Sequence, residues 1–208
     1  MNRYRPVTRT ALVAELADRL AATPGTLRVG IDGAPCTAPH DLADELVEPL
    51  RERGRPAARV RAHDFWHDAS LRLEHGREDI ESYLSWLDAA ALRREVLDPL
   101  MRDGTYLPSL RDAATNRATR AAPLAAPEAT VLLVDGTFLL GAGLPFELTV
   151  HLAMSAHALA RRTPPADSWT LPAYAEYERT VAPAERADVV VRVDDPRHPA
   201  VRVRAQPG

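Results

Sequence analysis

The chain has 208 residues and a formal net charge of -3, and all 26 of its Lys and Arg positions are arginine. Without lysine, no side chain can form a Schiff base or place an ammonium group on a nucleotide phosphate. The slightly acidic balance argues against nucleic-acid binding. The single cysteine, Cys36, excludes an internal disulfide and a multi-cysteine zinc site. No apolar run is long enough to cross a membrane, and Glu15 interrupts the N-terminal apolar stretch, so we expect a cytoplasmic bacterial protein without a signal peptide.

The predicted elements follow from apolar periodicity and from Gly and Pro positions. In chain order they are helix 8–22, strand 27–31, loop 32–39, helix 40–53, strand 57–61, helix 88–97, strand 131–136, strand 147–152, helix 155–162, a helix around Tyr174 and a last strand 187–193. Residues 131–134 form the clearest buried strand, because four apolar residues precede an acid and a glycine. Strands that alternate with helices predict a doubly wound, three-layer α/β/α fold with a parallel sheet.

We expect one domain over residues 1–208, with an additional helix in 1–23 and a turn-rich excursion over 104–128. In doubly wound sheets, ligands bind beyond the carboxyl ends of the strands. Asp32, His63, Asp64 and Asp135 each directly follow a predicted strand, so the pattern gathers them at one edge of the sheet.

Several segments resemble the bacterial, actinobacterial-type uridine-kinase-like nucleoside kinases, a P-loop family. The segments that carry the resemblance run in the family's order over roughly residues 27–195, and they are GIDG at 30–33, LADEL at 42–46, DF at 64–65, DAAALRREVLDPL at 88–100, residues 112–117, LVDGTFLL at 133–140 and ADVVV at 187–191. The resemblance implies a P-loop-kinase-like fold, with a lid-like segment over 163–183.

The resemblance also implies roles for individual residues. Catalysis would fall to His63, Asp64 and Asp135, with Asp135 also the candidate metal ligand. The nucleotide-phosphate contacts would come from Gly33, Thr37, His40, Asp41, Arg161 and Arg162. The substrate contacts would come from Asp112, Thr115, Arg77 and Tyr83.

The departures from the family fall on the phosphate-binding loop. A P-loop reads Gly, four residues, Gly, Lys, then Ser or Thr. Here Ala38 replaces the second glycine, Pro39 the lysine and His40 the metal-binding hydroxyl. Proline lacks the N–H that cradles phosphate, and alanine is expected to resist the positive φ that glycine tolerates. Histidine is a poor ligand for Mg²⁺, which prefers oxygen. The sequence therefore predicts a degenerate Walker A motif.

Three hypotheses follow. In the first, the protein keeps a cleft for a nucleoside or phosphorylated small molecule but has lost ordinary ATP-dependent transfer, and it acts as a binder, regulator or partner subunit. In the second, it is an active uridine or nucleoside kinase that uses ATP and Mg²⁺ through an atypical loop, with Arg161 or Arg162 supplying charge. In the third, it is a different enzyme that uses His63, Asp64 and Asp135 as acid–base groups in that cleft. No cofactor is certain, and a homo-oligomer or a protein partner stays open.

Single residues leave alternatives open. Asp135 fits either a bound cation or a helix cap, and His40 either an anion contact or a plain helix start. Cys36 fits either a reactive thiol or a small filler. His63 and His67 would share a face if their segment were helical, which would suit a metal, but polar turn residues are the simpler interpretation. The three tryptophans either shape a pocket or pack in the core, and they are Trp66, Trp86 and Trp169.

Overall fold

The fold is described from a computed structural model, over residues 4–204. The strands are β1 (Arg5–Pro6), β2 (Leu27–Gly33), β3 (Ala57–Arg61), β4 (Thr105–Tyr106), β5 (Arg111–Asp112), β6 (Arg117–Ala118), β7 (Leu124–Ala125), β8 (Val131–Gly136), β9 (Leu148–Ala153), β10 (Val189–Arg192) and β11 (Ala200–Val203). The α-helices are α1 (Arg9–Ala22), α2 (Pro39–Glu52), α3 (Ala69–Arg72), α4 (Ile80–Leu84), α5 (Ala89–Leu92), α6 (Asp98–Asp103), α7 (Ala156–Arg162), α8 (Leu171–Thr180) and α9 (Pro183–Arg186).

Seven strands form one twisted sheet in the order β1-β11-β10-β9-β2-β8-β3. The five strands from β10 to β3 run parallel, which confirms the predicted doubly wound α/β/α fold. The sheet is not wholly parallel, because β11 and β1 add antiparallel at one edge. The expectation that 187–193 holds the last strand is therefore wrong. β11 follows the turn at 194–199 in the sequence. Its four residues are too few for strand alternation to identify it.

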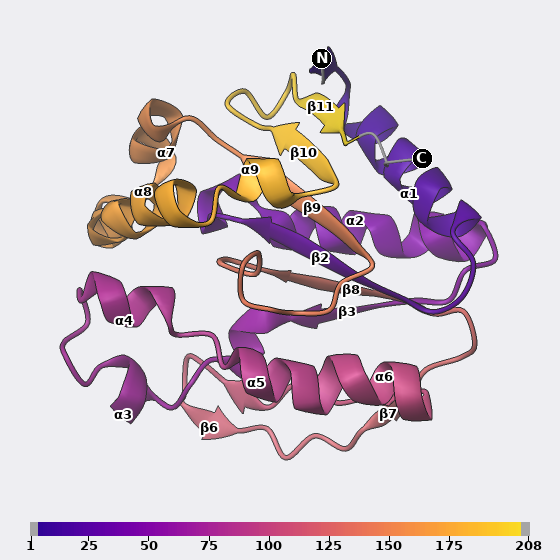
Figure 1. Cartoon of the computed structure of the whole chain (residues 1–208), viewed down its shortest axis with the longest axis horizontal. Helices are drawn as coiled ribbons and strands as arrows, with labels where there is room; N and C mark the ends of the chain where they lie inside the picture. The colour runs from indigo at the N-terminus through magenta and orange to yellow at the C-terminus, as the bar shows by residue number, and fades with distance from the viewer. Residues whose placement is uncertain (1–3, 205–208) are drawn as a thin grey trace.

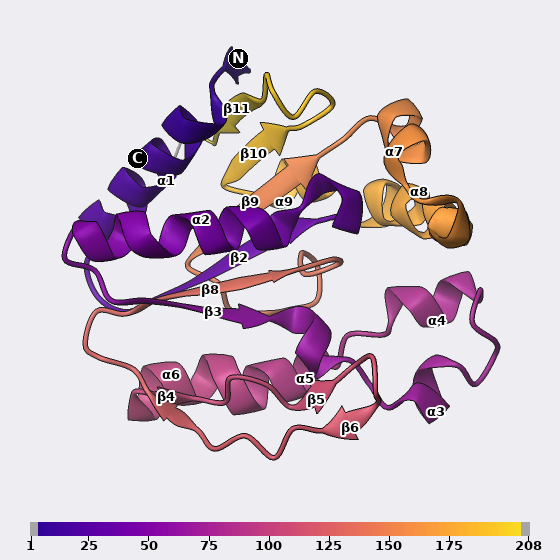
Figure 2. The same cartoon turned by 180° about the vertical axis from the view of Figure 1, so that it is seen from behind.

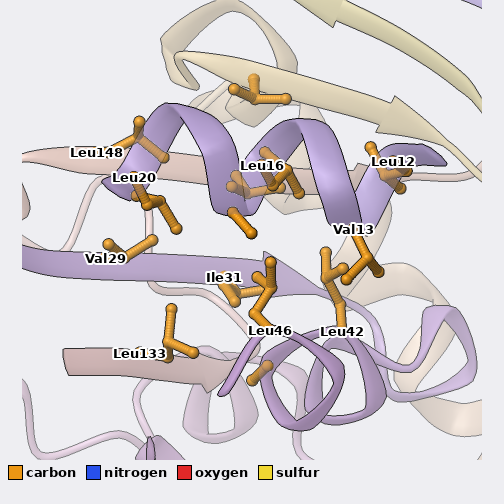
Figure 3. Packing of buried hydrophobic residues seen from close by; sticks show 14 of the residues in the cluster. Leu12, Val13, Leu16, Leu20, Val29, Ile31, Leu42, Leu46, Leu133 and Leu148 are labelled. Atoms are coloured by element: carbon orange, nitrogen blue, oxygen red, sulfur yellow. The ribbon is translucent and has the colours of Figure 1, made fainter. Parts of the chain in front are cut away.

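Side chains of β8 alternate between two cores, which places helices on both faces of the sheet. Val131 and Leu133 pack with α1 and α2, as Figure 3 shows for Leu133 beside Leu46. Leu132 and Val134 pack instead in the cluster with α5, the π-helical turn Arg93–Leu97 and α6. Figures 1 and 2 show these two helical layers on either side of the strands.

Helix α1 belongs to the first of these layers. Leu12, Leu16 and Leu20 are almost fully buried, and they recur every fourth residue along its inner face. Thr8 caps the helix by accepting from the N–H of Ala11. The cap and the leucine stripe explain why the predicted and observed helices agree at this point.

The excursion at 104–128 folds as two small antiparallel pairs, β4 with β7 and β5 with β6. The carboxyl ends of the central strands point toward the side of the molecule that carries α4, α7 and α8 (Figure 2). A third buried cluster, rich in aromatic rings, lies among these helices. Within the described part of the chain, no helix is long and apolar enough to span a membrane.

Candidate functional site

The backbone after β2 enters helix α2 through one residue with positive φ. Strand β2 ends at Gly33, residues Pro35–Thr37 make one 3-10 turn, and α2 begins at Pro39. Between turn and helix, Ala38 has φ 57° and ψ 57°. Alanine thus adopts the positive φ that it was expected to resist, and it does so at a cost in strain. Pro39 at the first helical position fixes the start of α2, and the chain accepts the left-handed strain one residue before it.

The N–H groups of this loop are bonded to the loop itself. The Thr37 amide donates to the carbonyl of Ala34 at 2.8 Å, and the Ala38 amide donates to that of Pro35 at 3.0 Å. The Thr37 hydroxyl also donates to the Ala34 carbonyl, at 2.7 Å. A Cβ on Gly33 would lie 2.5 Å from that hydroxyl oxygen, so Thr37 fills the space above Gly33. Two of the amides that a phosphate cradle would use are thus occupied by the loop's own carbonyls.

The helix start beyond the loop is exposed. His40 and Asp41 lie at the first turn of α2, and their side chains pair with each other at 3.1 Å between Nε2 and Oδ1. Arg161 and Arg162 end helix α7, where Arg162 donates to the carbonyl of Val193 at 3.1 Å. The structure thus ties Arg162 to the loop after β10 and leaves Arg161 exposed.

Asp135 is held by an arginine. Its carboxylate accepts from Arg59 at 2.6 and 3.1 Å, and Arg59 also donates to Asp44 on α2 at 2.6 Å. Burial lowers the pKa of Arg59, but the two carboxylates outweigh burial and raise it above its usual value. Asp32 and Asp135 lie inside β2 and β8, which corrects the expectation that they follow those strands. Within residues 4–204, no three His, Cys, Asp or Glu side chains gather as a metal site.

His63, Asp64 and Asp112 line one cavity of about 310 Å³ between the 3-10 turn Ala62–Phe65 and the β5–β6 pair. Asp64 is buried and bonded to Arg61 at 2.9 Å. The carboxylate of Asp112 accepts from the amide of Thr115 in the hairpin turn, and this bond is the main cause that lowers the pKa of Asp112. Thr115 thus contacts Asp112.

His63 and His67 do not share a helix. The 3-10 turn ends at Phe65, before His67. The His63 ring instead packs on Trp66, with centroids 3.9 Å apart, and His67 lies 3.6 Å from the carboxylate of Asp88. His63 and His67 therefore do not lie on one helix face, which was the arrangement that would have suited a metal.

A second cavity, of about 200 Å³, has five aromatic side chains among its twelve lining residues and is called the aromatic cavity below. It brings together residues from the α3–α4 region, the loop after β2 and the segment before α8, and they are Pro35, Cys36, Trp66, Arg77, Tyr83, Trp86, Thr163, Pro164, Asp167, Trp169, Thr170 and Tyr174. The three tryptophans thus meet in one pocket, together with two of the predicted substrate residues, Arg77 and Tyr83. The indole Nε1 of Trp169 is buried and has no hydrogen-bond partner within the described residues. That N–H is an unsatisfied buried donor.

A buried polar network near the loop was missed by the sequence analysis. Asp32 is fully buried, and its carboxylate accepts from the amide of Leu139 at 2.9 Å and from the hydroxyl of Tyr177 at 3.1 Å, while Nδ1 of His151 lies 2.7 Å away. His151 and Tyr177, together with Gly33 and Thr37, line the largest cavity described, of about 570 Å³. A signal was present in the sequence, since His151 stands between the apolar residues Val150 and Leu152 of a strand.

Comparison with known proteins supports the fold. No family model matches the sequence, and no curated protein matches it. Among solved structures, the chain is similar to a possible uridine kinase from Bacillus stearothermophilus, with 22% identity over 86% of this chain and 96% of the other, at a TM-score of 0.70. It is also similar to a candidate fructose transport system kinase from Silicibacter sp. TM1040, with 20% identity over 83% and 92% of the two chains and a TM-score of 0.54. These likenesses and the strand order place the chain in the three-layer α/β/α fold of the P-loop kinases.

Proposed function

We propose that this protein binds a nucleoside through a uridine-kinase-like fold and does not carry out ordinary ATP-dependent phosphoryl transfer. The observation that carries the proposal is the closed loop, whose Thr37 and Ala38 amides donate to carbonyls three residues back. Phosphoryl transfer depends almost entirely on positioning and on neutralising charge. A loop whose Thr37 and Ala38 amides are bonded to its own carbonyls contributes little to positioning the phosphate or to neutralising its charge.

The charges around the loop support the same proposal. The chain has no lysine, and the loop's lysine position holds Pro39. The carboxylate of Asp135 is neutralised by Arg59, so binding Mg²⁺ there would require breaking a pair that is only 7% exposed on the Asp135 side. A degenerate Walker A motif and a role as a pseudokinase fit this arrangement.

The aromatic cavity supports nucleoside binding. Base rings stack on Trp and Tyr side chains, and Trp66, Tyr83, Trp86 and Trp169 all line this space. The free N–H of Trp169 and the guanidinium of Arg77 offer donors for base or ribose oxygens. The naming of one structural neighbour as a possible uridine kinase makes a pyrimidine nucleoside the first ligand to test.

A second candidate is an active kinase with an atypical loop. The left-handed backbone of Ala38, at the position of the second glycine, favours it, because the chain there follows a path that a P-loop requires. A third candidate is acid–base chemistry at His63 and Asp64, which share a cavity with Asp112. Asp135 pairs with Arg59 instead, so this chemistry would rest on the other two groups.

Calorimetry with uridine and with ATP·Mg²⁺ tests the proposal. We expect uridine to bind and ATP·Mg²⁺ to give no heat, with no uridine monophosphate formed in a single-turnover assay. Trp169→Phe keeps an aromatic ring but removes the N–H and part of the stacking surface, so uridine binding should weaken about three- to tenfold. Arg77→Ala should weaken it too, whereas the exposed Arg93→Ala is the matched control. Formation of uridine monophosphate would establish the kinase, and uridine binding unaffected by Trp169→Phe and Arg77→Ala would remove the aromatic cavity from the proposal.

Restoring the loop gives a complementary test. The triple variant Ala38→Gly, Pro39→Lys, His40→Ser rebuilds the motif's glycine, lysine and hydroxyl. We expect this variant to bind ATP·Mg²⁺ where the parent protein does not. If the parent binds the nucleotide as tightly as the variant, the closed loop is not the obstacle that we infer.

A further inference from the structure

The cavity that His151 lines lies between the loop after β2, the end of β9 and the helices α7 and α8. Its volume of about 570 Å³ falls in the range of small-molecule sites. Most of its wall is apolar, with Leu152, Met154, Leu159 and Leu171 among the lining side chains. The cavity therefore suits a carbon skeleton, and His151 and Glu178 bring ionisable groups to its wall.

Nδ1 of His151 is hydrogen-bonded to Asp32, whereas Nε2 has only a longer ion-pair contact with Glu178. The side chain is 4% exposed, and Nδ1 lies 2.7 Å from the Asp32 carboxylate. Because an ionised carboxylate only accepts, Nδ1 must carry the proton in that bond. The second nitrogen, Nε2, is buried and has no hydrogen-bond partner in the described part of the chain. One polar atom of the cavity wall is thus left for a ligand.

The protonation state of His151 makes Nε2 a donor. Burial lowers its pKa, but the carboxylates of Asp32 and Glu178 prevail and raise it to about 9. The ring is then an imidazolium at neutral pH, with an N–H on each nitrogen. Such a ring donates hydrogen bonds and cannot serve as a general base.

Glu178 faces the same nitrogen without bonding to it. Its Oε1 lies 3.7 Å from Nε2, which exceeds hydrogen-bond distance. A ligand group beside this gap meets a donor from His151 and an acceptor from Glu178. A hydroxyl satisfies both, since it accepts through a lone pair and donates through its proton. A ketone or an ether only accepts, so it would leave the carboxylate of Glu178 without a hydrogen-bond donor.

The charges of the three side chains restrict the charge that the ligand can carry. Asp32 and Glu178 are two carboxylates against one imidazolium, so the cluster is net negative and repels phosphate or a carboxylate. An ammonium group would meet the positive ring and leave Nε2–H unpaired. A neutral group that both accepts and donates fits these groups, and a hydroxyl is the smallest that does so.

We propose that this cavity binds a neutral, mainly apolar small molecule through an alcohol hydroxyl, which accepts from Nε2 of His151 and donates to the carboxylate of Glu178. The site is separate from the aromatic cavity proposed for the nucleoside, although Tyr174 borders both. The inference therefore stands or falls independently of nucleoside binding.

The test uses the whole chain, labelled with ¹⁵N, and a panel of neutral alcohols that runs from cyclohexanol through borneol to farnesol. Borneol has two matched analogues, because camphor replaces the hydroxyl by a ketone and bornane removes it. The His151 ring nitrogens report binding directly. We expect an alcohol to shift the Nε2 resonance and to bind about tenfold more tightly than its ketone or hydrocarbon analogue.

Variants assign the contact. Glu178→Ala should weaken alcohol binding about tenfold, whereas Glu176→Ala, on the same helix but paired with Arg179, should leave it unchanged. The proposal is overturned if no alcohol in the panel shifts His151, if camphor binds as tightly as borneol, or if Glu178→Ala has no effect. A shift of His151 by uridine and by none of the alcohols would also overturn it, since the ribose hydroxyls would then be the ligand.

Discussion

The ionisation of His151 makes the stability of this protein depend on pH. Two carboxylates face the ring, Asp32 from β2 and Glu178 from α8, and the hydroxyl of Tyr177 donates to the same Asp32 carboxylate. The usual pKa of 6.5 is raised to about 9 in the folded protein. The folded state then holds its proton more tightly than the unfolded state. The stabilisation is complete below pH 6.5 and is lost as pH rises through 9.

The two pKa values correspond to about 3 kcal/mol of stability between these limits, at about 1.4 kcal/mol for each pH unit. Other groups titrate over the same range, so the comparison needs variants. In His151→Gln, the free energy of unfolding should lose this part of its pH dependence, whatever the variant's absolute stability. His157→Gln, at an exposed histidine on α7, should keep the parent's profile.

Urea denaturation at intervals from pH 6 to pH 10 measures the effect, and the NMR titration of the His151 ring measures its cause. A midpoint near 6.5 for this imidazole would refute the reasoning, because the carboxylates would then not outweigh burial. An identical pH profile for the parent and for His151→Gln would refute it as well.

Three substitutions test other features by urea denaturation. Ala38→Gly removes left-handed strain and should stabilise the protein by about 1 kcal/mol, and a loss of stability would contradict the conformational reading. Arg59→Met leaves the buried carboxylate of Asp135 unpaired and should cost about 2–3 kcal/mol, whereas a neutral result would mean that the pair is solvated. Gly30→Ala places a Cβ 2.7 Å from the Phe146 ring and should cost about 1–3 kcal/mol, unless the ring turns aside freely.

Local patterns were enough to predict much of the fold. Strand 131–136 and strand 57–61 match β8 and β3 at both ends, because runs of apolar residues bounded by turn residues define buried parallel strands. The antiparallel edge at β11 was missed, since a four-residue edge strand carries little periodicity. Asp32 was assigned to a loop although it lies in β2.

The site was harder to predict because its contacts join distant parts of the chain. His151 and Asp32 are separated by 119 positions, and no spacing rule links them. The pairing of Asp135 with Arg59 could not be predicted either, because Arg59 lies on the neighbouring strand β3 and faces Asp135 only once the sheet forms. Ala38 differs from both, because its residue type predicted a negative φ and the fold imposes a left-handed conformation.

Tyr174 separates the two cavities near the loop, and its hydroxyl lies 2.8 Å from that of Tyr83. This contact between the two hydroxyl groups joins helix α4 to helix α8. A molecule that moves the Tyr174 ring from one side changes the shape of the space on the other. By thermodynamic reciprocity, whatever factor a nucleoside imposes on binding of an alcohol, the alcohol imposes on binding of the nucleoside. Tyr83→Phe removes one hydroxyl of this pair, so the effect of each ligand on binding of the other, compared between this variant and the parent, tests for coupling through the contact.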